Sequence, residues 1–115
     1  MKINVAEHIE LYNGEMLREG DPKNGKLVEL RVILCNALMF DDKEKDLMVK
    51  LRRNMLATTC VKNDEVELHA DNVVMLMKLV NESYGTLIAG PVLALLDPVK
   101  AAQAEKDGVS KTAEA

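Results

Sequence analysis

The chain has 115 residues and a net charge of −4, a size that fits one domain. Its 48% hydrophobic and 30% charged residues exclude disorder over most of the length. Its acidic balance argues against non-specific binding to nucleic acid, because neutralising phosphates supplies most of that affinity. Apolar runs fall short of the roughly 20 residues that a membrane span needs, and the N-terminal segment is unlike a signal peptide. We therefore expect a cytoplasmic protein without membrane contact.

Residues 3–12 allow two interpretations. Alternating apolar positions such as Ile3 and Val5 indicate a strand, whereas Asn4 and Glu7 have the spacing of a helix capping box. The composition favours the helix.

The turn pair Asn13-Gly14 comes next. After it, residues 15–18 are expected to form a short strand and residues 19–26 a loop, because that segment is rich in Gly, Asp, Asn and Pro. The pattern over 27–40 predicts a helix so apolar that it belongs at the centre of the domain or at an interface, and the centre is favoured.

The next predicted helix begins at Asp41-Asp42 and ends near Thr58. Two sets of its residues follow helical spacing. The predicted buried face consists of Leu47, Met48, Leu51 and Met55. The predicted outer face carries Lys43, Lys50 and Arg53.

A short strand is expected around Val66, pairing with the segment after Gly14, and a helix over 70–84. The apolar stretch 87–96 contains Pro91, so its helix either begins at that proline or kinks there. Together these elements predict a mainly α fold with a minor β component. It is a compact domain of four or five helices over 1–97 with a two-stranded ribbon, followed by a flexible tail over 98–115.

No group of reactive residues predicts catalysis. Cys35 and Cys60 lack the CxxC spacing of metal or redox sites and are expected to be reduced, buried thiols. His8 and His69 have no companion at metal-ligand spacing. The chain also lacks a glycine-rich phosphate loop and a nucleophile motif. We therefore expect no enzyme activity, no cofactor, and no catalytic or metal-binding residues.

Charge is distributed unevenly along the chain. Residues 41–63 carry six basic and four acidic side chains, and residues 64–97 carry one basic and six acidic. The acidic candidate for a partner surface consists of Glu65, Glu67, Asp71 and Glu82. The basic candidate consists of Lys43, Lys50, Arg52 and Arg53. This asymmetry predicts self-association, and Met-rich apolar faces left exposed are further candidates for protein contact.

Several short segments resemble small proteins encoded in tailed-phage and prophage genomes. They include Gly14-Glu15-Met16-Leu17, Asn36-Ala37-Leu38 and Asp64-Glu65-Val66-Glu67-Leu68. The resemblance covers roughly residues 1–97 and rests on structural rather than chemical motifs. It implies a phage setting, with the host cytoplasm as location, and no particular activity. Pro91 departs from the pattern, where a helix former is expected.

The function expected from these observations is a non-enzymatic protein–protein interaction module. In a phage or prophage it would be an accessory, assembly or host-inhibitor protein, with a protein partner or a second copy of itself. The alternative is a small DNA-binding transcriptional regulator that uses the basic helix over 43–58.

Overall fold

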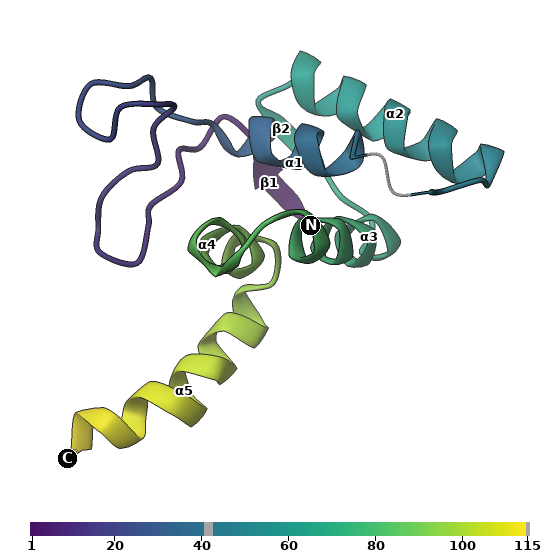
Figure 1. The fold of residues 1–115 in the computed structure, drawn as a ribbon. Helices are drawn as coiled ribbons and strands as arrows, with labels where there is room; N and C mark the ends of the chain where they lie inside the picture. Colours follow the sequence, from purple (N-terminus) through teal and green to yellow (C-terminus); the bar gives the residue numbers. More distant parts are fainter. Residues whose placement is uncertain (41–42, 115) are drawn as a thin grey trace.

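The computed structural model describes residues 1–40 and 43–114, with side chains described as far as Asp107 (Figure 1). Within this part of the chain, two short strands and five helices form a mainly α fold, which confirms the predicted class. Their bounds are β1 Lys2–Asn4, α1 Leu30–Leu38, α2 Leu47–Lys62, β2 Glu65–Glu67, α3 Ala70–Ser83, α4 Thr86–Leu96 and α5 Pro98–Glu114.

The two strands form an antiparallel ribbon in which Ile3 lies opposite Val66, and both side chains are buried. The helix favoured for residues 3–12 is therefore wrong. The ribbon pairs β2 with β1, not with the segment after Gly14, which corrects a second expectation. Pairing across more than 60 residues satisfies the backbone groups of β1, and this outweighs the local preference for helix.

The segment between β1 and α1 is a long loop held by isolated backbone bridges rather than by a regular strand. Met16 bridges to Glu10, and Arg18 bridges to Leu27. The predicted turn at Gly14 is confirmed, with φ of +84°, a left-handed conformation that glycine adopts without strain.

Helix α1 lies at the centre of the core, as expected, and packs against both α2 and α3. Leu30 and Leu34 are fully buried, and burial of each such side chain contributes about 1.5–3 kcal/mol. The helix is shorter than predicted because residues 27–29 are extended: Leu27 bridges to Arg18 and Glu29 bridges to His8 within the long loop.

Helix α3 has nearly the predicted bounds and buries Leu76 and Val80. Helix α4 begins at Thr86 and passes through Pro91, so it does not begin at the proline. Gly90 precedes this proline and lacks the Cβ that would crowd the pyrrolidine ring, which eases helical backbone at that point.

Helix α5 projects from the body of the molecule (Figure 1). Within the described residues, no single helix is long and apolar enough to cross a membrane. Helices α4 and α5 meet the length and composition criteria only as a pair, and the chain bends by 118° between them. Residues 98–114 are thus helical, and the flexibility expected for this tail stays a prediction.

A substitution at Gly25 tests how closely the backbone of the long loop packs on itself. A Cβ at this position would lie 1.9 Å from the backbone oxygen of Glu19 and 2.6 Å from that of Asp21. We expect Gly25→Ala to lower the free energy of unfolding by about 2 kcal/mol, because backbone must move. Gly85→Ala is the control, since its Cβ would meet open space, and a poorer N-cap costs at most about 1 kcal/mol. Urea denaturation of both variants provides the measurement, and equal losses would contradict the prediction.

Candidate interaction surface

Helix α2 begins later and ends later than the sequence predicts. The side chain of Asp46 accepts hydrogen bonds from the backbone amides of Met48, at 2.8 Å, and Val49, at 3.4 Å, and so caps the helix. Residues 43–46 precede the helix, and the predicted start at Asp41-Asp42 lies outside the described residues.

The helix continues through Thr58 and Thr59 to Lys62. Both threonine hydroxyls donate to backbone oxygens four residues earlier, at 2.9 Å, which satisfies them within the helix.

The side of α2 that packs on the core is not the predicted one. Its buried residues are Leu56, Ala57 and Cys60, all in the second half of the helix. The predicted buried residues are instead exposed, and we call them the α2 face: Leu47, Met48, Leu51 and Met55. Their exposed fractions run from 47% for Leu51 to 69% for Met55. Small side chains such as Ala57 and Cys60 let α2 approach α1 closely, which the larger stripe would prevent.

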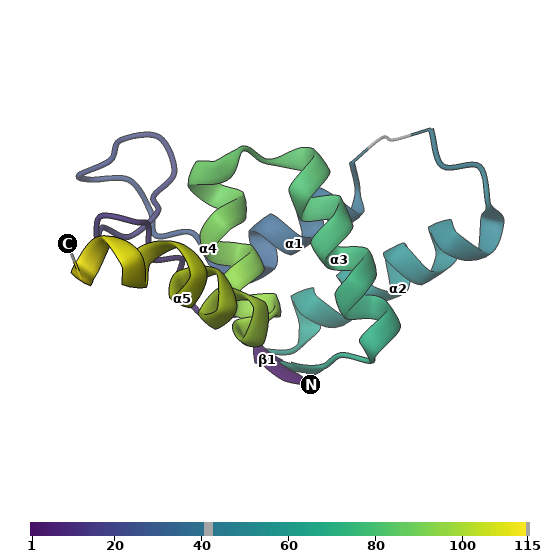
Figure 2. The same ribbon diagram turned by 90° about the horizontal axis from the view of Figure 1, so that it is seen from below.

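The α2 face adjoins a groove of about 540 Å³ between α2, β2 and the start of α3. Met55, Leu56 and Val66 supply apolar walls, while Arg52 and Glu67 supply charge. The first half of α2 also extends beyond the end of α1 in both ribbon views (Figures 1 and 2). This end of the molecule therefore combines an apolar strip with charges of both signs.

The acidic candidates separate into two places. Glu65 and Glu67 are exposed on β2. The Oε1 atom of Glu65 lies 3.6 Å from Lys2 Nζ, and that of Glu67 lies 3.2 Å from the Met1 amino group. Asp71 is exposed in the first turn of α3, close to β2 in sequence. Glu82 lies near the other end of α3, so the four do not form one surface.

Three of the four basic candidates line one hollow of about 420 Å³: Lys43, Arg52 and Arg53. Glu82 lines the same hollow, so the structure mixes the predicted acidic and basic surfaces. Arg53 was predicted on the outer face, yet its side chain is only 12% exposed and lies 3.9 Å from Glu44. Lys50 lines a separate hollow beside Phe40.

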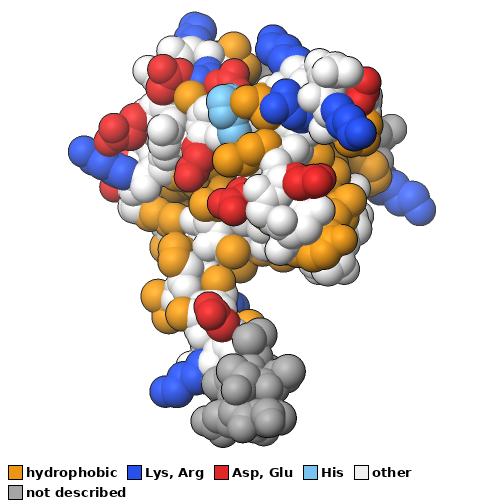
Figure 3. All heavy atoms as spheres, turned by 90° about the vertical axis from the view of Figure 1, so that its left-hand side faces the viewer, with side chains coloured by type: hydrophobic (Ala, Val, Ile, Leu, Met, Phe, Trp, Pro, Cys, Tyr) orange, Lys and Arg blue, Asp and Glu red, His pale blue; other side chains and the backbone are white. Residues whose placement is uncertain are grey.

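The face of the molecule formed by the long loop shows a similar mixture of charges. In Figure 3, Lys and Arg side chains alternate with Asp and Glu, and hydrophobic patches lie between them. Nothing on this face resembles a continuous basic stripe of the kind that follows a nucleic-acid backbone.

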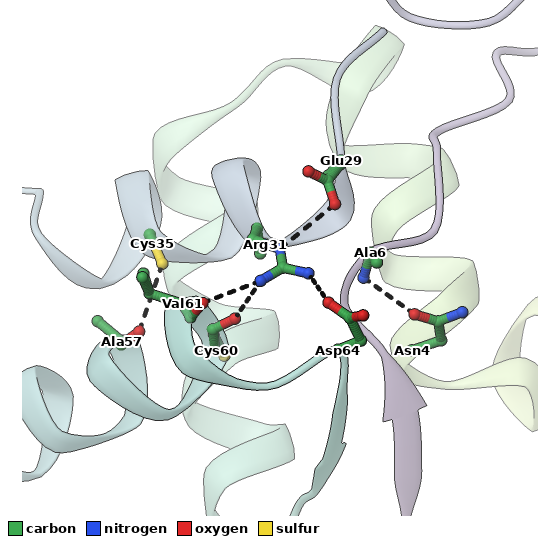
Figure 4. A network of polar contacts seen from close by, with 9 residues as sticks. All are labelled: Asn4, Ala6, Glu29, Arg31, Cys35, Ala57, Cys60, Val61 and Asp64. Carbon is green, nitrogen blue, oxygen red and sulfur yellow. Dashed lines mark hydrogen bonds and ion pairs between the residues drawn. The ribbon is translucent and has the colours of Figure 1, made fainter.

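Arg31 fixes the end of α2 against the rest of the fold (Figure 4). Its Nη1 donates to the backbone oxygens of Cys60 and Val61, both at 3.1 Å, which are otherwise unsatisfied at a helix end. Its Nη2 pairs with Asp64, and its Nε lies 3.4 Å from Glu29. The hydrogen bond with Asp64 is the main cause that raises the pKa of the guanidinium. The sequence signal for this role is a lone cation within an apolar helix.

Removing the guanidinium of Arg31 should loosen the last turn of α2. We expect Arg31→Met to lower the melting temperature by several degrees, because the Cys60 and Val61 oxygens and Asp64 lose their hydrogen-bond donor and Glu29 loses a neighbouring cation. Amide hydrogen exchange should increase over residues 59–62. Arg18→Met is the matched control, since Arg18 donates to one backbone oxygen, that of Gly25, in the loop. Unchanged exchange over 59–62 in Arg31→Met would count against this role.

The two cysteines are free thiols, as expected, although only Cys60 is fully buried and Cys35 is half-buried. The Sγ of Cys35 lies 3.7 Å from the backbone oxygen of Ala57 and lines an apolar hollow of about 330 Å³. Burial raises the pKa of Cys35, and burial together with the nearby Cys35 raises the pKa of Cys60 to about 11. Because the thiolate is the nucleophile, both sites oppose nucleophilic chemistry at neutral pH.

The raised pKa of Cys60 makes stability depend on alkaline pH. The unfolded thiol ionises near pH 9 and the folded one near pH 11, so the stability contributed by Cys60 is complete below pH 9 and is lost as pH rises toward 11. The stability advantage of the wild type over Cys60→Ala should therefore fall by about 2 kcal/mol between pH 8.5 and 11. Cys35→Ala should show a smaller change. Urea denaturation across this range gives the measurement, and a constant difference would refute the assignment.

The structure offers no centre for metal chemistry among residues 1–40 and 43–107: no three His, Cys, Asp or Glu side chains gather there. Comparisons with protein-family models, with curated proteins and with solved structures found no match for this chain. The assignment of a function therefore depends on the chain's own surfaces, of which the α2 face is the most distinctive.

Proposed function

We propose that this protein is a non-enzymatic protein–protein interaction module that contacts its partner through the α2 face. One observation carries the proposal: four large apolar side chains lie together on a helix whose other side packs on the core. Adjacent exposed Leu and Met side chains of this kind are typical of contact surfaces rather than of monomer surfaces. Met side chains also adapt to the shape of a partner.

The energetics support a contact of this kind. Complete burial of a Leu or Met side chain is worth about 1.5–3 kcal/mol relative to exposure, and the four residues of the α2 face are between 47% and 69% exposed. A partner that covers them gains roughly half to two thirds of this free energy, since the side chains are already partly covered, and it does so without disturbing the core. Arg52 and Glu67 in the adjoining groove would add selectivity, because a partner must match both charges.

The alternative, a DNA-binding regulator that uses the helix over 43–58, has weaker support. The hollow lined by Arg52 and Arg53 also holds Lys43 and Lys78, and the carboxylates of Glu44 and Glu82 among these four cations lower the positive potential that phosphates require. The first half of α2 presents the α2 face to solvent, and apolar side chains do not bind phosphates.

The phage-related roles expected from the sequence, as an accessory, assembly or host-inhibitor protein, remain proposals. Each of them requires contact with another protein chain, so an interaction module is compatible with all three. The proposed function thus concerns the mode of action and does not choose among these settings.

Site-specific cross-linking tests the proposal. We expect benzoylphenylalanine in place of Leu51 to give cross-linked protein adducts upon illumination in the cells that produce the protein. The same residue in place of Leu87 should give few, since Leu87 is comparably exposed but lies on α4. Adding Met55→Asp to the Leu51 derivative should reduce the adducts at least tenfold, and equal labelling at both positions would overturn the proposal.

A further inference from the structure

We infer that the α2 face and the open edge of β2 together bind an extended segment of a partner protein, which adds a third strand to the β1–β2 ribbon. The segment carries apolar side chains at alternate positions and a carboxylate that pairs with Arg52. The inference rests on the proposed function and names the chemistry of the partner. Three features support it: the unpaired edge of β2, the groove beside this edge, and the charge of Arg52.

One edge of β2 has no partner within the described part of the chain. The backbone oxygen of Asp64 and the amide of Leu68 both bond to the N-terminal segment, so the even-numbered residues here face β1. Successive residues of a strand face opposite edges, which turns the backbone groups of Glu65 and Glu67 away from β1. None of these amides and carbonyls bonds to another described residue. Such an edge is a template for pairing with another chain.

The groove of the α2 face lies on this open side of β2. Val66 and Glu67 form one wall, α2 forms the other from Met48 to Thr59, and no residue of β1 lines it. This length of helix spans about 17 Å, which an extended segment of about five residues matches. The volume of about 540 Å³ lies within the range of about 300–1,000 Å³ that is typical of binding pockets.

The side chains of an added strand would meet the α2 face. Val66 and Leu68 are buried, so one face of β2 belongs to the core. A strand beside β2 continues the same alternation and directs every second side chain into the same layer. There these side chains meet Leu51 and Met55, which line the groove and are exposed in the single chain. The chain thus supplies apolar cover for a strand that it does not itself provide.

Arg52 sets the charge of the segment. It lines the groove together with Leu51 and Met55, and it is exposed and forms no ion pair within the described residues. Glu67, in contrast, is already paired with the Met1 amino group. Covering an unpaired guanidinium with apolar side chains alone costs desolvation free energy, and a carboxylate on the segment offsets that cost. We therefore expect one Asp or Glu among the apolar residues.

A second copy of β2 fits this edge less well than a separate segment. Each copy would bring its own α2 over the shared edge, into the layer that the other α2 already covers. Antiparallel pairing about Val66 would also set Glu65 of one copy opposite Glu67 of the other, and like charges in opposite positions are destabilising. A single extended segment, without a covering helix of its own, avoids both conflicts.

Selection from a random library tests the chemistry of the segment. We expect the full-length protein to enrich, from mRNA-displayed twelve-residue peptides, sequences with apolar residues at alternate positions and one Asp or Glu. Leu51→Asp should weaken binding of the selected peptide at least tenfold in fluorescence anisotropy, because it places a charge among apolar contacts. Leu87→Asp is the control, since this comparably exposed side chain lies on α4, and circular dichroism confirms that both variants fold. No enrichment, or apolar residues at helical spacing, would overturn the inference.

A charge exchange tests the role of Arg52. Arg52→Glu should weaken the selected peptide at least tenfold, and a peptide with Lys in place of its carboxylate should regain most of the affinity for this variant. Lys50→Glu is the matched control, because it makes the same change of charge on the same helix but lines a separate hollow. Equal losses in the two variants would refute the pairing with Arg52.

Two measurements test the addition of a strand. Binding should slow amide hydrogen exchange at Glu65 and Glu67 at least tenfold and change it less at Val66, whose amide already faces β1. N-methylation of one alternate set of peptide amides should weaken binding at least tenfold, and N-methylation of the other set should have little effect, because only one set faces β2. A complex in which Glu65 and Glu67 exchange as before, or in which both methylated peptides bind equally, would overturn the third strand.

The inference and the proposed function fail in different ways. Cross-links from position 51 to other proteins, without protection of Glu65 and Glu67, would remove the third strand and leave the interaction module. Cross-linked species with twice the mass of the chain would identify a second copy as the occupant and overturn the separate segment. The absence both of position-specific cross-links and of an enriched peptide would remove both.

Discussion

The fold depends on the way in which Arg31 joins three segments of the chain. Its backbone amide donates to the Val5 oxygen, at 2.8 Å, and so ties the first turn of α1 to the N-terminal segment. Its side chain binds the two carbonyls at the end of α2 and the carboxylate of Asp64. The backbone amide of Val5 in turn donates to the Asp64 backbone oxygen, at 2.7 Å, so the N-terminal segment is also bonded directly to the residue that precedes β2. The N-terminal segment, α1 and the α2–β2 connection are therefore positioned by one residue.

This constraint explains the unusual placement of α2. The helix is held at its C-terminal end by Arg31, and its buried residues, Leu56, Ala57 and Cys60, also lie in its second half. In its first half, Asp46 caps the helix start, and Arg53 lies 3.9 Å from Glu44 in the segment that leads into the helix. A helix anchored at one end can carry apolar side chains at the other end without those side chains taking part in the core.

The sequence predicted the elements with strong local signals and failed where distant contacts decide. The turn at Gly14, the central position of α1 and the bounds of α3 follow from local chemistry and periodicity. The first strand could not be predicted, because its partner lies more than 60 residues away. The α2 face was assigned to the core because it is the larger of two apolar stripes, and a single sequence cannot reveal that the smaller stripe, with Ala57 and Cys60, packs more closely.

The burial of the smaller stripe and the exposure of the larger one are also the strongest argument that the α2 face is a contact surface. When a helix buries its smaller side chains and exposes its larger ones, the exposed stripe costs free energy that the isolated chain does not recover. Covering this stripe leaves the main anchors of α2 in place, because Ala57 and Cys60 are buried against the core and Arg31 binds the carbonyls at the C-terminal end of the helix. The surface is therefore already formed in the single chain, and association through it loses little conformational entropy beyond that of its own Leu and Met side chains.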